Sequence, residues 1–132
     1  MEAPPVSTKA VMDIAVALRR LNGKEALLAG MAGLFLEDAP QVLEQLQVAI
    51  QTNSSAQIVR YAHNLRGLAA PFEATPVMDL TSQIERCGSG GSTTPLEGLI
   101  RELNSEMQRL SDALTELRSR SDAQRRSPPH PK

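Results

Sequence analysis

The sequence predicts an all-α protein, an antiparallel four-helix bundle with one or two additional N-terminal helices covering one end. Apolar residues recur at spacings of three and four along most of the chain, which is the period of a helix with one buried face. Short turns separate these segments, so neighbouring helices should pack antiparallel. Aromatic residues make up only 2% of the chain and tryptophan is absent, so the core must be aliphatic.

Glycine and proline divide the first half of the chain. A first helix is predicted over residues 11–21, and Gly23 ends it because glycine readily adopts the left-handed conformation that stops helices. A second helix is predicted over residues 24–38. Pro40 cannot continue that helix but can begin the next one, so we expect a separate third helix over residues 40–51.

The second half contains three more predicted helices. The fourth spans residues 55–70, and Pro71 marks its kink or its end. The fifth spans residues 76–87 and is followed by a glycine- and serine-rich connector over residues 88–92. The last helix, residues 96–117, keeps one leucine-rich seam for six turns. The bundle should consist of the third to sixth helices.

The ends of the chain differ from this helical domain, which we place at residues 10–118. Residues 1–9 read as a flexible leader, and residues 119–132 read as a disordered basic tail. Residues 118–132 contain five basic residues and one acidic residue, against a net charge of −5 for the rest. A basic tail can touch nucleic acid or a membrane surface. We favour a chain terminus or linker instead, and expect no contact with nucleic acid.

Composition excludes several classes of protein. No apolar run approaches 18 residues and the start is not a signal peptide, so we expect neither a membrane contact nor secretion. Cys87 is the only cysteine, so no internal disulfide can form. A cytoplasmic protein is the expectation.

His63 lies on the polar face of the fourth predicted helix. At about 100° per residue, the ring falls about 160° from Leu65, which lies at the centre of the apolar stripe. The histidine therefore points at solvent from the middle of a buried helix. A solvated surface histidine without a role is the plain alternative.

Gly67 favours a functional histidine. A glycine inside a helix costs about 1 kcal/mol relative to alanine. Helical side chains lean toward the N-terminus, so a side chain at position 67 would partly cover the ring of His63. Arg66 leans toward the ring and the ring leans toward Arg60. We therefore expect an accessible imidazole between two guanidinium groups, suited to an anion on the ring.

The segment Ala62-His63-Asn64-Leu65-Arg66-Gly67 resembles the Ala-His-x-Leu-Lys-Gly signature of histidine phosphotransfer (HPt) domains. Residues 34–40 are similar to the phenylalanine-containing segment of that family, and residues 80–86 to its following helix. Arg66 stands in place of the usual lysine and keeps the charge. Glu73 stands where the family commonly has a second glycine.

The resemblance implies a phosphocarrier of a multistep two-component phosphorelay. His63 would accept a phosphoryl group from the aspartate of a response-regulator receiver domain and pass it to another receiver. The family resemblance also allows the kinase core of a parent hybrid sensor kinase as a partner, in which case this segment would be the cytoplasmic part of a membrane-bound sensor kinase. We expect a monomer. The residues expected to contact phosphate or receiver are Arg60, Asn64, Arg66, Gly67 and Ala70.

The residue chemistry agrees with that role. The chain has no glycine-rich phosphate loop with a lysine and no metal-ligand spacing, so we expect no ATP site, metal or cofactor on this domain. The reactive group that remains is the imidazole of His63. Its ring nitrogen can act as a nucleophile, since an exposed imidazole is mostly neutral at pH 7. The acyl phosphate and its magnesium would come from the receiver. The alternative function is a non-catalytic helical interaction domain with an incidental surface histidine.

Overall fold

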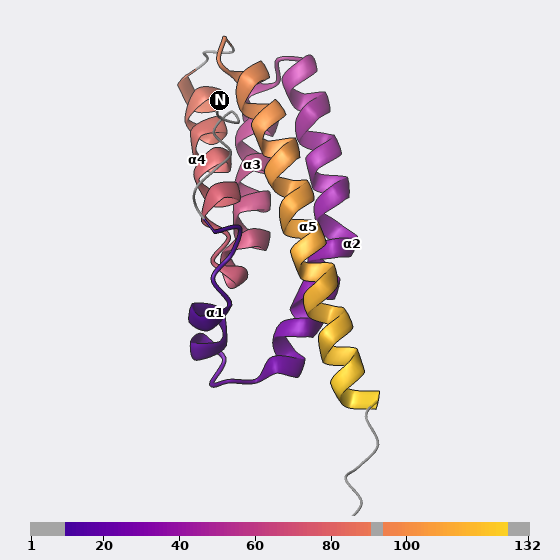
Figure 1. Cartoon of the computed structure of the whole chain (residues 1–132). Coiled ribbons are helices and arrows are strands. Elements are labelled where there is room, and N and C mark those ends of the chain that lie inside the picture. The colour runs from indigo at the N-terminus through magenta and orange to yellow at the C-terminus, as the bar shows by residue number, and fades with distance from the viewer. Residues whose placement is uncertain (1–9, 91–93, 127–132) are drawn as a thin grey trace, which may run out of the picture.

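The computed structural model describes residues 10–90 and 94–126, which form five α-helices, one 3-10 helix and no strand. The elements in chain order are α1 (Ile14–Arg20), α2 (Glu25–Gln51), α3 (Ser55–Ala69), η1 (Ala70–Phe72), α4 (Thr75–Gly90) and α5 (Leu96–Arg126). Helices α2 to α5 run alternately up and down as a bundle, and α1 lies at one end against η1 and α2 (Figure 1). The predicted all-α fold is confirmed.

Pro40 lies inside α2, so the predicted break between a second and a third helix is wrong. A proline inside a helix removes one backbone hydrogen bond and crowds the carbonyl group four residues earlier, which bends the helix. Pro40 is exposed, whereas Phe35, Ala39 and Leu46 are buried. Because the same core holds both halves, packing outweighs the local penalty. Figure 1 shows α2 changing direction about halfway along.

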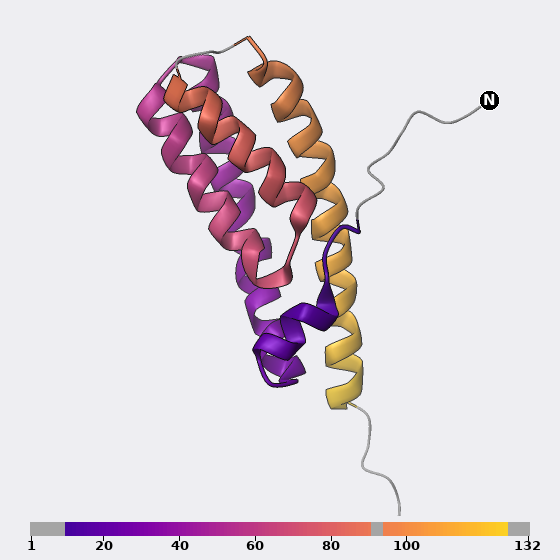
Figure 2. The same ribbon diagram turned by 90° about the vertical axis from the view of Figure 1, so that its left-hand side faces the viewer.

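The core is built from aliphatic side chains and alanines, as the composition predicts. Its two aromatic residues, Phe35 and Phe72, meet edge to face with ring centroids 6.0 Å apart. Asp13 caps α1 by accepting a hydrogen bond from the Val16 amide, so α1 begins three residues later than predicted. The Asp13 amide donates to the Phe72 carbonyl, which ties the start of α1 to η1. Figure 2 shows α1 at this end of the bundle, close to the start of α2.

Helix α3 ends beside Pro71, as predicted, and the chain turns at Glu73. This residue adopts a left-handed conformation, with φ of 51°, in the position where the resemblance expects a glycine. Its carboxylate accepts a hydrogen bond from Arg20 Nη2 at 2.7 Å, so the same residue that turns the chain also binds α1. The turn is therefore compatible with a side chain that makes a contact of its own.

The C-terminal boundary also differs from the prediction. Helix α5 continues to Arg126, so the end at residue 117 and the disordered tail from residue 119 are wrong for the first eight residues of that tail. Part of the predicted connector, Gly88 to Gly90, belongs to α4. The leader 1–9, the rest of the connector (91–93) and residues 127–132 lie outside the described residues.

Candidate functional site

Helix α3 presents His63 to solvent because its other face is fixed in the core. Ile58, Ala62 and Leu65 are buried against the neighbouring helices, whereas the His63 side chain is 64% exposed. No hydrophobic contact has to be broken to reach the ring. The helical periodicity of α3 thus determines the accessibility of the imidazole.

Arg66 holds one side of the His63 ring. Its Nη2 donates to His63 Nδ1 at 3.0 Å, because a guanidinium can only donate. Its Nη1 lies 3.1 Å from Ser82 Oγ and 3.0 Å from Glu85 Oε1, both on α4. The guanidinium therefore bridges α3 and α4, and its position relative to the ring is fixed by α4.

Glu85 is a site residue that the sequence did not reveal. Its Oε2 lies 3.8 Å from His63 Nδ1, on the same side as Arg66. Its Oε1 is buried, and no described residue forms an aligned hydrogen bond with it, so the contact with Arg66 Nη1 is an ion pair. The spacing of Ser82 and Glu85 puts both on one face of α4, but only the packing of α4 on α3 shows that this face meets Arg66.

The opposite side of His63 opens onto a groove between α2 and α3. The groove has a volume of about 540 Å³ and is lined by Asp38, Gln41, Val42, Gln45, His63, Asn64, Gly67 and Leu68. A β-carbon added at Gly67 would meet no heavy atom within 4 Å. The space above Gly67 is thus free, and the ring stands between a charged cluster and an open groove.

Two of the residues predicted to contact phosphate or receiver make contacts within the chain. The Arg60 guanidinium packs over the ring of Tyr61, with 5.6 Å between its Cζ and the ring centroid. The carbonyl of Ala70 accepts a hydrogen bond from Arg20. Among the described residues, neither Arg60 nor Ala70 forms a hydrogen bond or ion pair with His63. Arg66 is the guanidinium that touches the ring, whereas Asn64 and Gly67 line the groove.

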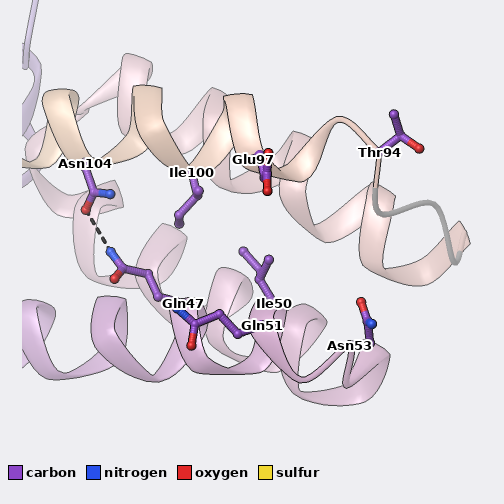
Figure 3. A pocket seen from close by; sticks show the side chains of 8 residues that line it. All are labelled: Gln47, Ile50, Gln51, Asn53, Thr94, Glu97, Ile100 and Asn104. Atoms are coloured by element: carbon purple, nitrogen blue, oxygen red, sulfur yellow. Dashed lines mark hydrogen bonds between the residues drawn. The ribbon is translucent and has the colours of Figure 1, made fainter.

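A second cavity has a different chemistry. It has a volume of about 630 Å³, lies between α2 and α5 and is shown in Figure 3. Amide side chains dominate it, with Gln47 donating to Asn104 at 2.9 Å, and it shares no residue with the groove at His63. Within the described part of the chain, no three His, Cys, Asp or Glu residues are placed to hold a metal ion.

Helix α2 is long and apolar enough to cross a membrane by length and composition alone. In the structure, Leu28, Phe35, Leu46 and four alanines of α2 are buried in the protein core. These core contacts account for part of its apolar character, whereas Leu27, Leu34 and Val48 of the same helix are exposed.

A four-helix bundle whose described residues present an accessible imidazole, with a guanidinium on its ring nitrogen, has the form expected of a helical histidine phosphocarrier. A family model described as Hpt domain matches residues 30–119, and the chain belongs to this family. Its members carry phosphoryl groups in phosphorelays rather than acting as kinases, and they exchange them with receiver domains. The chain is a phosphocarrier of this kind.

Two solved structures share the fold. One is histidine-containing phosphotransfer protein B (HptB) from Pseudomonas aeruginosa PAO1, with 18% identity, a TM-score of 0.77, and coverage of 83% of this chain and 96% of that one. The other is the HPT domain of a sensor hybrid histidine kinase from Shewanella, with 23% identity, a TM-score of 0.74, and coverage of 83% and 95%. The comparison with curated proteins gives no significant match.

Proposed function

We propose that His63 is the phosphoacceptor of this carrier. The observation that supports it is the position of the ring, which is exposed, contacted by Arg66 through Nδ1 and open to the groove on its other side. With Nδ1 facing the protein, Nε2 is the nitrogen that an incoming phosphoryl group meets. Its lone pair forms the N–P bond, while the P–O bond to the aspartate of the receiver breaks and its electron pair leaves on the carboxylate.

The attack requires the tautomer in which Nδ1 carries the proton, because only then does Nε2 have a free lone pair. Arg66 cannot accept that proton, whereas Glu85 Oε2, 3.8 Å from Nδ1, can accept it after a small side-chain movement. Arg66 thus favours the tautomer in which Nδ1 is unprotonated, and Glu85 favours the tautomer in which Nδ1 carries the proton. Once transfer has occurred, the phosphoryl group carries negative charge, and Arg66 is the guanidinium in contact with the ring.

The receiver domain is expected to dock over the groove. Gly67 leaves room above the ring, and Gln41, Gln45 and Asn64 offer amide groups around it. Leu34, 59% exposed, lies two helical turns before Gln41 on the same stripe of α2 and extends this surface with an apolar contact. The receiver supplies the aspartate and the magnesium ion that the transfer needs.

The domain binds no ATP, metal or cofactor of its own and acts as a cytoplasmic monomer without contact to nucleic acid. The kinase core of a parent hybrid sensor kinase is a further partner that the family relationship supports.

Replacing the histidine tests the assignment. His63→Gln should abolish uptake of acid-labile phosphate from a phosphorylated receiver and keep the helical circular-dichroism spectrum, because the exposed ring contributes little to the core. His130→Gln is the matched control, since it removes the other histidine of the chain and should leave uptake unchanged. Uptake by the His63→Gln protein would disprove the assignment and favour an interaction domain with an incidental histidine.

A further inference from the structure

Glu85 is the acidic neighbour of both His63 and Arg66. Its side chain is 25% exposed and that of Arg66 is 32% exposed, so the pair is screened less by water than a pair on an open surface. The buried Oε1 faces Arg66 Nη1 at 3.0 Å. Before transfer, the carboxylate and the guanidinium therefore balance each other beside the unphosphorylated ring of His63.

Phosphorylation changes this balance. A phosphoryl group on Nε2 adds negative charge on the side of the ring away from α4, because Nδ1 faces Arg66 and Glu85. Arg66 can follow that charge only by moving its guanidinium away from Ser82 and Glu85. Such a movement leaves the partly buried carboxylate of Glu85 without its positive partner, which is costly. The phosphoryl group and Glu85 thus compete for one guanidinium.

We propose that Glu85 sets the phosphoryl-transfer equilibrium of this carrier by holding Arg66 on α4, so that phosphohistidine is disfavoured relative to the aspartyl phosphate of the receiver. This inference rests on the proposed function of His63. A carrier must release what it accepts, and a guanidinium fully available to the phosphoryl group would retain it. Glu85 is a positioning residue here, since it acts on the phosphoryl group through Arg66.

Glu85→Gln tests the competition because the amide removes the negative charge and keeps an oxygen that can accept the proton of Nδ1. The protein is loaded with phosphoramidate and mixed with a receiver domain in magnesium buffer; the reverse reaction starts from the receiver loaded with acetyl phosphate. The receiver domain is chosen because it exchanges labelled phosphoryl groups with the wild-type protein. Because the receiver is the same in every reaction, the change in the equilibrium ratio reports the carrier alone.

The expected result is a shift toward phosphohistidine of about threefold to tenfold, the size of one charge interaction at a partly exposed site. Glu85→Asp, which keeps the charge on a shorter side chain, should fall between the wild type and Glu85→Gln. Glu106→Gln is the matched control, because it removes the carboxylate of another arginine ion pair, 2.7 Å long, on α5. The equilibrium ratio of phosphohistidine to aspartyl phosphate in Glu106→Gln should equal that of the wild type.

An unchanged ratio in Glu85→Gln, or a shift toward the receiver, would overturn the inference. The second outcome would show that Glu85 mainly stabilises the protonated ring of phosphohistidine. Either result would leave the proposed function intact as long as the wild-type protein takes up label at His63. A wild-type protein that takes up none would reject both proposals, and thermal melts of each variant show whether a change in ratio reflects loss of the fold.

Discussion

At the scale of single residues, the site depends on a glycine that has no structural reason to be one. Gly67 is exposed, lies inside α3 and would meet no heavy atom if it carried a β-carbon. Its φ is not positive, so a larger residue would fit the backbone without strain. A residue that weakens its helix without any packing benefit indicates that free space is needed there. That space borders the ring of His63 and the groove.

Gly67→Leu should therefore separate stability from function. The substitution removes a helix-weakening residue and should raise the free energy of unfolding by about 0.5–1 kcal/mol. The new side chain leans toward His63 and occupies the room that a receiver needs, and a displacement of about 1 Å at a transfer site can cost on the order of a hundredfold in rate. The transfer rate of Gly67→Ala should lie between those of the wild type and Gly67→Leu, since a methyl group covers less of the ring. Thermal melts and transfer time courses measure both effects.

Gly98→Ala supplies the comparison for Gly67→Ala. Gly98 lies in α5, and a β-carbon there would also meet no heavy atom within 4 Å. The gain in stability should be similar, while the transfer rate should stay at that of the wild type. A Gly67→Leu protein that accepts phosphate at the parent rate would refute this explanation of the glycine, even if His63 is the acceptor.

At the scale of elements, the packing of α4 on α3 positions the charged cluster. The two helices are in close contact at Gly88, where an added β-carbon would lie 2.8 Å from Ile58 Cγ2 and 3.2 Å from Val59 Cγ2. Ile58 is fully buried, so its side chain has little room to move. The absence of a side chain at residue 88 thus permits the spacing at which Ser82 and Glu85 reach Arg66.

Gly88→Ala should push α4 away from α3 and destabilise the protein by about 1–3 kcal/mol, the usual cost of an overpacked contact. Gly90→Ala is the control on the same helix, because a β-carbon there would meet no heavy atom within 4 Å. It should change the free energy of unfolding by less than about 0.5 kcal/mol. Denaturant titrations compare the two variants, and equal midpoints would contradict the proposed close contact.

At the scale of the whole molecule, α1 and the last turns of α5 extend the bundle beyond the region matched by the family. Ile14 and Leu18 of α1 border a small pocket with Leu117, Arg120 and Ser121 of α5. This pocket, of about 220 Å³, shares no residue with the groove at His63. Stability and phosphotransfer should therefore respond differently to changes at this end.

Removing residues 119–132 tests that separation. The deletion takes away only exposed or half-exposed side chains among the described residues of this segment, so we expect a loss of at most about 1 kcal/mol in the free energy of unfolding. Transfer to His63 should keep its parent rate, because no described residue of the deleted segment lines the groove. Differential scanning calorimetry and a transfer time course provide the two readings. A marked fall in rate would show that the C-terminal segment contributes to receiver docking.

Much of the architecture could be predicted because helical periodicity and turn residues are local properties. The apolar stripe of α3 placed Leu65 in the core and His63 in solvent, as the structure shows. The turns at Gly23 and after Gln51 were equally evident from the sequence. The end of α5 was missed because polar residues after Leu117 can remain helical without burying anything, and a break in the apolar pattern does not reveal that.

The sequence alone determined the helical class, the exposed face of His63 and the resemblance to phosphotransfer domains. Tertiary structure decided what surrounds the ring. The helix that lies beside α3 brings Ser82 and Glu85 to Arg66, and Arg60 packs on Tyr61 instead of the imidazole. Tertiary structure also keeps α2 helical across Pro40, because residues before and after the proline are buried in the same core. A helix face follows from residue spacing along one segment, whereas contacts between segments depend on how all of them pack together.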